Sequence, residues 1–131
     1  MRNALWPSPA REHAVEIDRY FAGTVREPLE VLIAFDEQGT AIGLIELSIR
    51  AYAEGCDTDR VAFVEGWYVD PDARGEGVGA ALIGAAEDWA RSQGCTELAS
   101  DTEVENVSSA AAHRAVGFVE TAVVRCFRKS L

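Results

Sequence analysis

Apolar positions in the first half of the chain follow two different spacings. Over Ala10 to Phe21 they recur at helical intervals, whereas Leu29 to Phe35 and Ala41 to Ile49 are continuous runs rich in branched residues. The turn sequence Asp36-Glu37-Gln38-Gly39-Thr40 separates these two runs. The pattern therefore predicts one helix followed by an antiparallel hairpin.

The second half of the chain alternates between the two spacings. Its expected strands are Val61 to Asp70, Thr96 to Ser100 and Phe118 to Phe127, and its expected helices are Val78 to Gln93 and Val107 to Val116. Alternating strands and helices predict an α/β (α+β) fold, with crossover connections in a mixed sheet flanked by helices. The face of the longer helix that we expect to cover the sheet carries Val78, Leu82, Ile83, Ala86, Trp89 and Ala90.

A glycine-rich stretch, Arg74-Gly75-Glu76-Gly77-Val78-Gly79, lies between an expected strand and the longer helix. The first backbone N–H groups of a helix have no intrahelical partner and carry the positive end of its dipole, so glycines there admit a phosphate. An ordinary tight turn is the alternative. Neither the Walker pattern nor the dinucleotide pattern G-x-G-x-x-G fits this stretch.

Composition and charge narrow the class of protein. A chain of 131 residues with 48% hydrophobic residues is one globular domain. Its net charge of −10 opposes nucleic-acid binding and suits a cationic small molecule, although acidity also serves solubility. No apolar run reaches the roughly 20 residues of a membrane span, so we expect no membrane partner and a cytoplasmic location.

The three cysteines, Cys56, Cys95 and Cys126, have neither disulfide-framework nor zinc-ligand spacing. We expect them to be reduced, buried thiols, and we expect no metal site.

Two motifs in order carry a resemblance to a known family. Arg74-x-x-Gly77-x-Gly79 resembles the coenzyme A pyrophosphate loop of the GCN5-related N-acetyltransferases (GNAT), and Asn106-x-x-Ser109-x-x-x-His113-x-x-x-Gly117-Phe118 resembles the second half of that site. Further phrases closely resemble the aminoglycoside 6'-N-acetyltransferases within the family: Leu5-Trp6-Pro7, Tyr52 to Cys56, Phe63 to Gly66, Cys95 to Asp101, and Gly117 to Thr121.

The resemblance implies a GNAT fold over residues 1–131, with an acceptor-side half at 1–60 and an acetyl-CoA-binding half at 61–131. The family's fold carries one more strand and most of a helix before the position of Trp6. We therefore expect the family's first strand to be missing from this chain.

By resemblance, the acetyl-CoA site is largely main chain. Trp67, Tyr68 and Val69 are expected to bind the pantetheine arm and the thioester, although Trp67 and Tyr68 are also ordinary strand formers. The pyrophosphate site continues through Arg74, Gly75, Glu76, Gly77, Val78, Gly79 and Ala80, and the second motif adds Asn106 and Ser109. Arg74 as a solvated loop cation is the alternative.

Two acids are the candidate catalytic and acceptor-binding residues. Glu65 interrupts an apolar strand, where a buried carboxylate needs a partner or a shifted pKa, and Asp101 follows an expected strand end. The resemblance assigns both to the aminoglycoside pocket, where Glu65 binds an ammonium and passes a proton away through water. The alternatives are a solvated Glu65 and a capping or turn role for Asp101.

Three further positions are expected to contact the acceptor by resemblance. Trp6 and Tyr52 match aromatic positions of the pocket. Glu120 stands two residues before Ala122, where related enzymes have an acid, so one acceptor contact is either missing or supplied by Glu120. His113 occupies the position at which many family members place a tyrosine acid. We expect His113 to pack near the coenzyme sulfur rather than to protonate it, with donation as the alternative.

Together these features predict an acetyl-CoA-dependent transferase that acetylates the 6'-amine of aminoglycosides, confers antibiotic resistance and forms a homodimer. Two alternatives remain open at this point. One is the same chemistry on another amine, such as a polyamine or a metabolite, and the other is a non-catalytic acyl-CoA-binding module.

Overall fold

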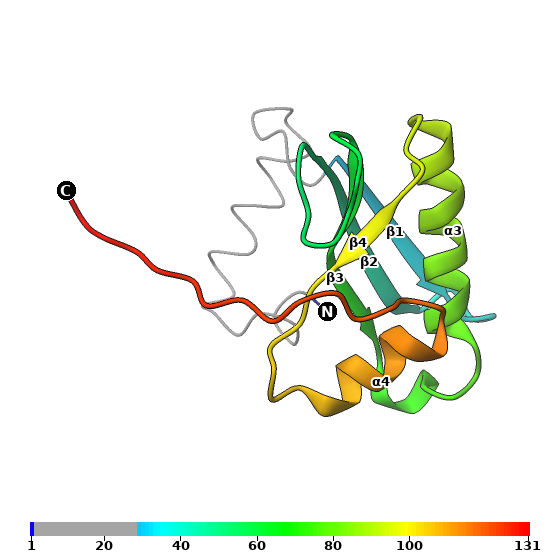
Figure 1. The fold of residues 1–131 in the computed structure, drawn as a ribbon. Coiled ribbons are helices and arrows are strands. Elements are labelled where there is room, and N and C mark those ends of the chain that lie inside the picture. Colours follow the sequence, from blue (N-terminus) through cyan, green and yellow to red (C-terminus); the bar gives the residue numbers. More distant parts are fainter. Residues whose placement is uncertain (2–28) are drawn as a thin grey trace.

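The computed structural model describes Met1 and residues 29–131, and Figure 1 shows the arrangement of their elements. In chain order these are β1 Glu30–Phe35, β2 Ala41–Arg50, β3 Val61–Val69, the 3₁₀ turn η1 Pro71–Ala73, α3 Val78–Ser92, β4 Leu98–Ser100 and α4 Val107–Ala115. The predicted helix over Ala10 to Phe21 and the acceptor contact Trp6 lie outside the described residues.

The described strands form one mixed sheet in the order β1-β2-β3-β4. The β1–β2 and β2–β3 pairs are antiparallel, and β3 pairs with β4 in parallel after a crossover through α3. The predicted hairpin turn closes through Asp36, whose carboxylate Oδ1 accepts hydrogen bonds from the N–H groups of Gln38 and Thr40. The predicted mixed sheet and its crossover are confirmed.

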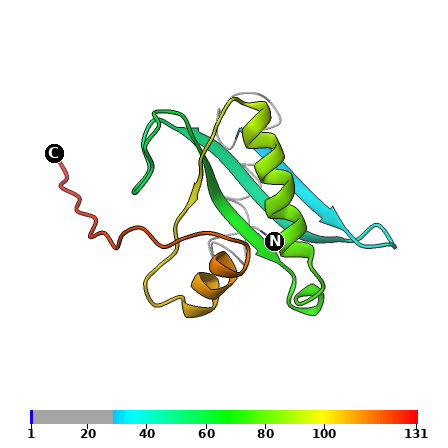
Figure 2. The same ribbon diagram turned by 45° about the vertical axis from the view of Figure 1, so that its right-hand side comes forward.

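Helix α3 covers one face of the sheet and supplies the core (Figure 2). Its buried residues are Leu82, Ile83, Ala86 and Ala90, all on the predicted face. The first three pack with Ile45, Leu47 and Val64 of the central strands. Truncating a buried side chain such as Ile83 to alanine costs about 2–5 kcal/mol of unfolding free energy, so this layer holds the strands in place for the site.

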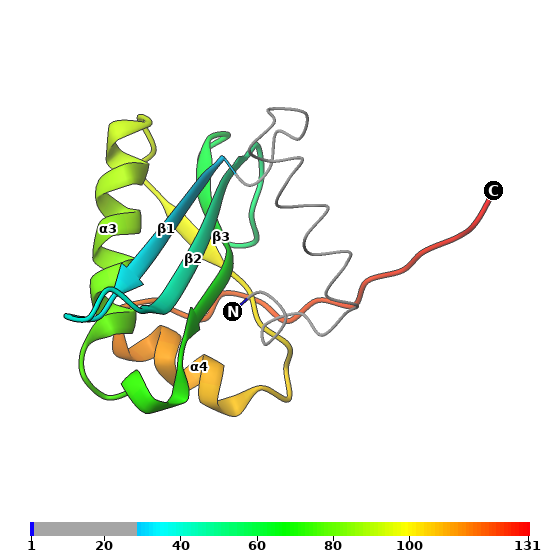
Figure 3. The same ribbon diagram turned by 180° about the vertical axis from the view of Figure 1, so that it is seen from behind.

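Helix α4 lies beside the end of β3 (Figures 1 and 3). It begins because Asn106 caps it: the side-chain Oδ1 accepts a hydrogen bond from the N–H of Ser109 at 3.1 Å. It ends before Gly117, which adopts a φ of 99°. Both predicted helices of the described region are therefore confirmed to within about two residues at each end.

The predicted last strand, Phe118 to Phe127, is wrong. Residues 118–131 carry no regular secondary structure, and the chain runs away from the body of the protein in all three ribbon views. An alternating apolar pattern forms a strand only when a neighbour accepts and donates its backbone hydrogen bonds. Its apolar side chains are accordingly exposed, with Val119 at 83% and Phe127 at 90%.

The three cysteines carry free thiols, and Cys95 is buried. Cys56 is half-buried and Cys126 is exposed, so the expectation that all three are buried is wrong. Cys126 is exposed because it lies on the unpaired segment 118–131. Within residues 29–131, no helix is long and apolar enough to cross a membrane, and no group of His, Cys, Asp or Glu side chains is arranged to hold a metal ion.

Candidate active site

Glu65 sits at an irregularity in the sheet. Glu46 of β2 pairs with Gly66, and the next residue, Leu47, pairs with Val64, so Glu65 faces no residue of β2. An extra residue of this kind is a β-bulge, which bends the strand and re-aims a side chain. The bulge places Glu65 on β3 just before the segment Trp67 to Val69 that we expect to bind the thioester arm.

The Glu65 carboxylate has well-defined partners. Arg50 at the end of β2 donates to it twice, from Nε to Oε1 at 3.1 Å and from Nη2 to Oε2 at 2.8 Å. The Ser48 hydroxyl donates to Oε1 at 2.5 Å. The expectation that this acid needs a partner is confirmed, and the alternative of a freely solvated Glu65 is wrong, because its side chain is only 25% exposed.

Arg50 is a site residue that sequence reasoning missed. Its guanidinium carbon lies 3.6 Å from the centroid of the Phe63 ring, a cation–π contact that fixes the fork facing Glu65. The two partners are 15 residues apart in sequence, and only the register of β2 on β3 brings them together. Any cation that binds the Glu65 carboxylate therefore shares it with Arg50.

Asp101 comes directly after β4 and is exposed. The β3–β4 ladder ends at the pair Val64 and Ser100, so Glu65 and Asp101 each follow the last residue that their strand pairs in this ladder. The structure thus brings the two predicted acids to the same end of this ladder. Two carboxylates at one end of a ladder favour a cationic ligand over an anionic one.

His113 on α4 is held at both ring nitrogens. Nδ1 lies 2.7 Å from the carbonyl oxygen of Ser109, and Nε2 lies 2.8 Å from the hydroxyl oxygen of Ser100. Edge-on rings of Trp67 and Phe118 flank it, each with a centroid 5.2 Å away. The imidazole therefore packs between Trp67 of β3 and Phe118.

The glycine-rich loop leaves the start of α3 open to solvent. Gly77 is the N-terminal cap of α3 with a φ of 85°, and no side chain bonds to the N–H groups of the first turn. A Cβ placed on Gly77 meets nothing within 4 Å. Unpaired N–H groups, the helix dipole and open space together fit the pyrophosphate of acetyl-CoA.

Two neighbours shape this loop. Arg74 donates from Nε to the carbonyl of Val69 at 2.8 Å, which ties the head of the loop to the end of β3. The indole of Trp67 packs against Gly79, where an added Cβ would lie 3.1 Å from the ring. The Trp67 indole N–H is buried and has no hydrogen-bond partner among residues 29–131, so a polar group is available beside the loop.

The connection from β2 to β3 is held by a carboxylate that sequence reasoning also missed. Glu97 accepts hydrogen bonds from the N–H groups of Asp57 and Thr58 and from the Thr58 hydroxyl, the last at 2.7 Å. These bonds lower the pKa of Glu97. The same connection carries Tyr52, which is 65% exposed, and the neighbouring Glu54 raises the pKa of Tyr52 through a hydrogen bond and its charge.

The other predicted contacts have local partners. Glu120 forms an exposed ion pair with Arg114 at 2.8 Å. Asn106 caps α4 through the N–H of Ser109, so these two residues of the second motif bond to each other.

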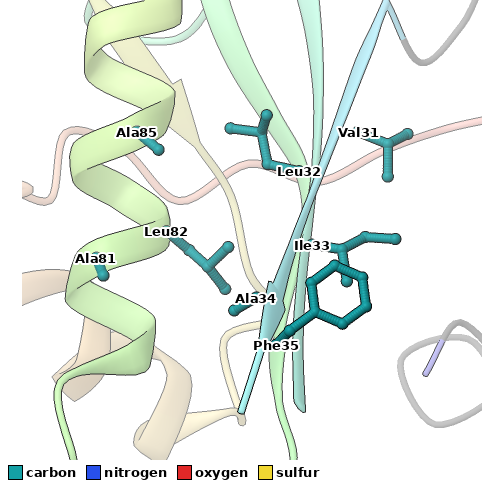
Figure 4. A pocket seen from close by; sticks show the side chains of 8 residues that line it. All are labelled: Val31, Leu32, Ile33, Ala34, Phe35, Ala81, Leu82 and Ala85. Atoms are coloured by element: carbon teal, nitrogen blue, oxygen red, sulfur yellow. The ribbon is translucent and has the colours of Figure 1, made fainter. Parts of the chain in front are cut away.

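A hollow of about 480 Å³ lies along the edge of β1 beside α3, and its lining residues come from these two elements alone (Figure 4). Ligand sites combine apolar walls with a few placed polar groups, and the side chains lining this hollow are all apolar. We therefore place the candidate site at the β3–β4 ladder end and the α3 loop.

Strand β3 carries a bulge with the ion-paired acid Glu65 and leads through the glycine-rich loop into the open start of α3. This arrangement defines a mixed α/β protein that is suited to hold a phosphate-bearing group beside a cationic ligand. The chain belongs to the acetyltransferase (GNAT) family, because the sequence model of that family matches residues 1–118. The sequence-based assignment of family and fold class is confirmed.

Relatives across the full chain are aminoglycoside acetyltransferases. The chain is 56% identical to the aminoglycoside N(6')-acetyltransferase type 1 of Klebsiella aerogenes, over 100% of this chain and 87% of the relative. The chain shares 40% sequence identity with the 6'-N-acetyltransferase AAC(6')-IG from Acinetobacter haemolyticus. Its apo crystal structure superposes with a TM-score of 0.88 over 99% of this chain and 88% of that one. AAC(6')-Iy in complex with a bisubstrate analogue, CoA-S-monomethyl-acetylneamine, is 39% identical, with a TM-score of 0.83 over 100% of this chain and 88% of that one.

Proposed function

We propose that this chain transfers the acetyl group of acetyl-CoA to the 6'-amine of aminoglycoside antibiotics. The observation that carries the proposal is the placement of two acids, Glu65 and Asp101, directly after the last pair of the β3–β4 ladder, on a sheet whose Trp67 packs against Gly79 at the open start of α3. Full-length relatives named for this activity support the same acceptor and cosubstrate.

The cosubstrate supplies an acetyl group activated as a thioester. We propose that main-chain N–H groups at the start of α3 hold its pyrophosphate, with Arg74 ordering the head of the loop through the carbonyl of Val69. The main chain of Trp67, Tyr68 and Val69 then aligns the pantetheine arm. Because backbone groups do this work, the fold rather than side-chain chemistry orients the reacting carbon.

The acceptor amine reaches the site as an ammonium and has to lose a proton before it attacks. We propose that Glu65 binds the ammonium and passes that proton to water, while Arg50 keeps the carboxylate in a fixed pose. Asp101 adds a second negative group, and Tyr52, Glu120 and Trp6 are proposed contacts to the sugar rings. The chain's net charge of −10 favours the approach of a polycation.

Resistance follows from the change in charge. Acetylation converts an ammonium into a neutral amide, and the drug loses one positive charge. Binding of a polycation to RNA phosphates depends steeply on the number of charges that it neutralises, so the modified drug binds its target more weakly.

We propose further that the protein is a homodimer that works in the cytoplasm. The segment 118–131 presents Val119, Val123 and Phe127 to solvent without a strand neighbour, and a second copy of the chain can cover such a segment. Free thiols on all three cysteines suit a reducing compartment. Light scattering in solution tests the dimer: twice the mass of one chain is expected, and a monomer at micromolar concentration contradicts it.

Thiol release from acetyl-CoA tests the activity, with tobramycin, kanamycin and spermidine as acceptors. We expect rapid release with both aminoglycosides and little with spermidine. Preference for spermidine would favour a polyamine acetyltransferase. Tight acetyl-CoA binding with no release on any amine would favour a non-catalytic binding module.

A further inference from the structure

We infer that Arg50 is a positioning residue whose positive charge helps the bound acceptor amine to give up its proton. The inference rests on the proposed function, because it deepens the role of Glu65 within the same acceptor site. It starts from the hydrogen bonds that the Glu65 carboxylate already has and from the position that they leave for a ligand.

The two oxygens of Glu65 share these hydrogen bonds unevenly. Oε1 accepts from the Ser48 hydroxyl and from Arg50 Nε, whereas among residues 29–131 the only donor to Oε2 is Arg50 Nη2, at 2.8 Å. A carboxylate oxygen has two lone pairs, so Oε1 is filled and Oε2 keeps one position for a further donor. The side chain of Glu65 is 25% exposed, so a ligand can reach it. The acceptor amine therefore binds at Oε2.

An amine at Oε2 lies close to the guanidinium of Arg50. Both groups donate to the same oxygen, and a charge-assisted hydrogen bond of this kind is about 2.8 Å long. The two nitrogens are therefore at most about 6 Å apart, whatever the direction from which the amine approaches. The contact between the guanidinium and the Phe63 ring holds Arg50 in this place.

Glu65 and Arg50 act on the amine in opposite directions. The carboxylate favours the ammonium form, and a positive charge within about 6 Å disfavours it. A guanidinium stays charged in proteins, so the ion pair of Arg50 and Glu65 is neutral as a whole. The pair thus binds the amine by a hydrogen bond without strongly stabilising its ammonium form. The N–H bond breaks, the proton leaves through Glu65 to water, and the freed lone pair attacks the thioester carbon.

Other charged or titratable groups belong to the elements around this ion pair. Within the described part of the chain they are Glu46 on β2, Tyr68 on β3 with Arg74 over its ring, Asp101 after β4, and Tyr52 and Glu54 on the β2–β3 connection. The same groups are present in the wild type and in any variant of Arg50. A difference in pH dependence between these proteins therefore reports the change at Arg50.

Three variants test the inference by steady-state kinetics with tobramycin across pH. Arg50→Gln should raise the pH midpoint of kcat by about one unit, because the bound ammonium is no longer opposed by a like charge. At pH 7 both KM and kcat should then fall about 10-fold, with kcat/KM nearly unchanged. Arg50→Lys keeps the charge, so its pH midpoint should stay within about half a unit of the wild type. Arg91→Gln is the matched control, because it removes the same charge from an exposed position of α3 and should leave KM and the midpoint unchanged.

A measurement without catalysis needs only the wild type. With coenzyme A in place of acetyl-CoA no transfer occurs, and carbon-13 NMR of bound kanamycin follows the protonation of its 6'-amine. That amine should titrate at a pH no higher than in the free drug. This measurement decides the matter if Arg50→Gln folds poorly in thermal unfolding.

Three results would overturn the inference. They are a bound 6'-amine whose pKa is raised by one unit or more, a folded Arg50→Gln with a raised KM and an unchanged pH midpoint, and equal midpoint shifts in the Gln and Lys variants of Arg50. The second result would mean that Arg50 only holds the carboxylate in place. Absence of any aminoglycoside acetylation by the wild type would instead contradict the proposed function.

Discussion

Replacing Gly77 with aspartate should abolish acetyl-CoA binding while leaving the protein folded. Gly77 caps α3 with a φ of 85°, and a Cβ on it projects into open space. An aspartate side chain therefore extends in front of the first turn of α3. There its carboxylate accepts hydrogen bonds from the N–H groups that we assign to the pyrophosphate. Both competition for donors and repulsion of phosphate oppose binding.

The magnitude follows from the geometry of the cap. A side chain in the left-handed region costs about 1–2 kcal/mol of unfolding free energy, and Asn and Asp tolerate this conformation better than other residues. Unit charges of the same sign about 6 Å apart, at an effective dielectric of about 20, repel by about 3 kcal/mol. Repulsion alone thus weakens acetyl-CoA binding about 100-fold.

Gly77→Asn is the matched control, because it has the same shape and backbone cost without the charge. Calorimetric titration with acetyl-CoA should show the affinity ordered wild type, Asn variant and Asp variant, with the gap between Asn and Asp shrinking at high salt. Thermal unfolding checks that both variants fold. Equal affinities of the Asn and Asp variants would refute the assignment of the pyrophosphate to this helix start.

Three further predictions address the acceptor site and its support. Glu65→Gln should lower kcat/KM for tobramycin by a factor that corresponds to roughly 2–5 kcal/mol of transition-state stabilisation, and Asp101→Asn, at an exposed position, by a smaller factor. Acetyl-CoA affinity should be unchanged in both variants, and wild-type rates in both would remove the acids from the site. His113→Ala should lower kcat only a few-fold in steady-state assays, whereas a hundredfold loss with intact cofactor binding would make it the general acid. Glu97→Gln should lower the Tm at pH 7, because a folded-state pKa below the ordinary 4.5 stabilises the protein above that pH. This difference should disappear as the pH falls through the lowered pKa, and a Tm gap that persists at acidic pH contradicts the hydrogen-bond account.

Much of the fold was predictable because local signals agree with each other. The long helix α3 has apolar residues on one face and glycines at both ends, Gly77 and Gly94, and it was predicted to within a residue. The strand predicted at Phe118 to Phe127 failed because its partner is not encoded in its own sequence. Alternating apolar residues show that a segment suits a sheet, and they do not supply the neighbour that makes one.

The chemistry of the site was only partly predictable for the same reason. The motifs located Glu65 and the glycine-rich loop, since each stands out against its own neighbours. The partner of Glu65 depends on a bulge that shifts the register of β2 on β3, which no local pattern reports. Likewise, Ser100 meets His113 only because β4 ends where α4 passes.

The position of the new amide on the product is the most direct test of 6'-N-acetyltransferase activity. Kanamycin is incubated with the enzyme and acetyl-CoA, and the purified product is mapped by two-dimensional NMR. We expect a single acetyl group on the 6'-nitrogen, produced at the rate of thiol release. Acetylation at a different nitrogen, or thiol release without an acetylated drug, would contradict it.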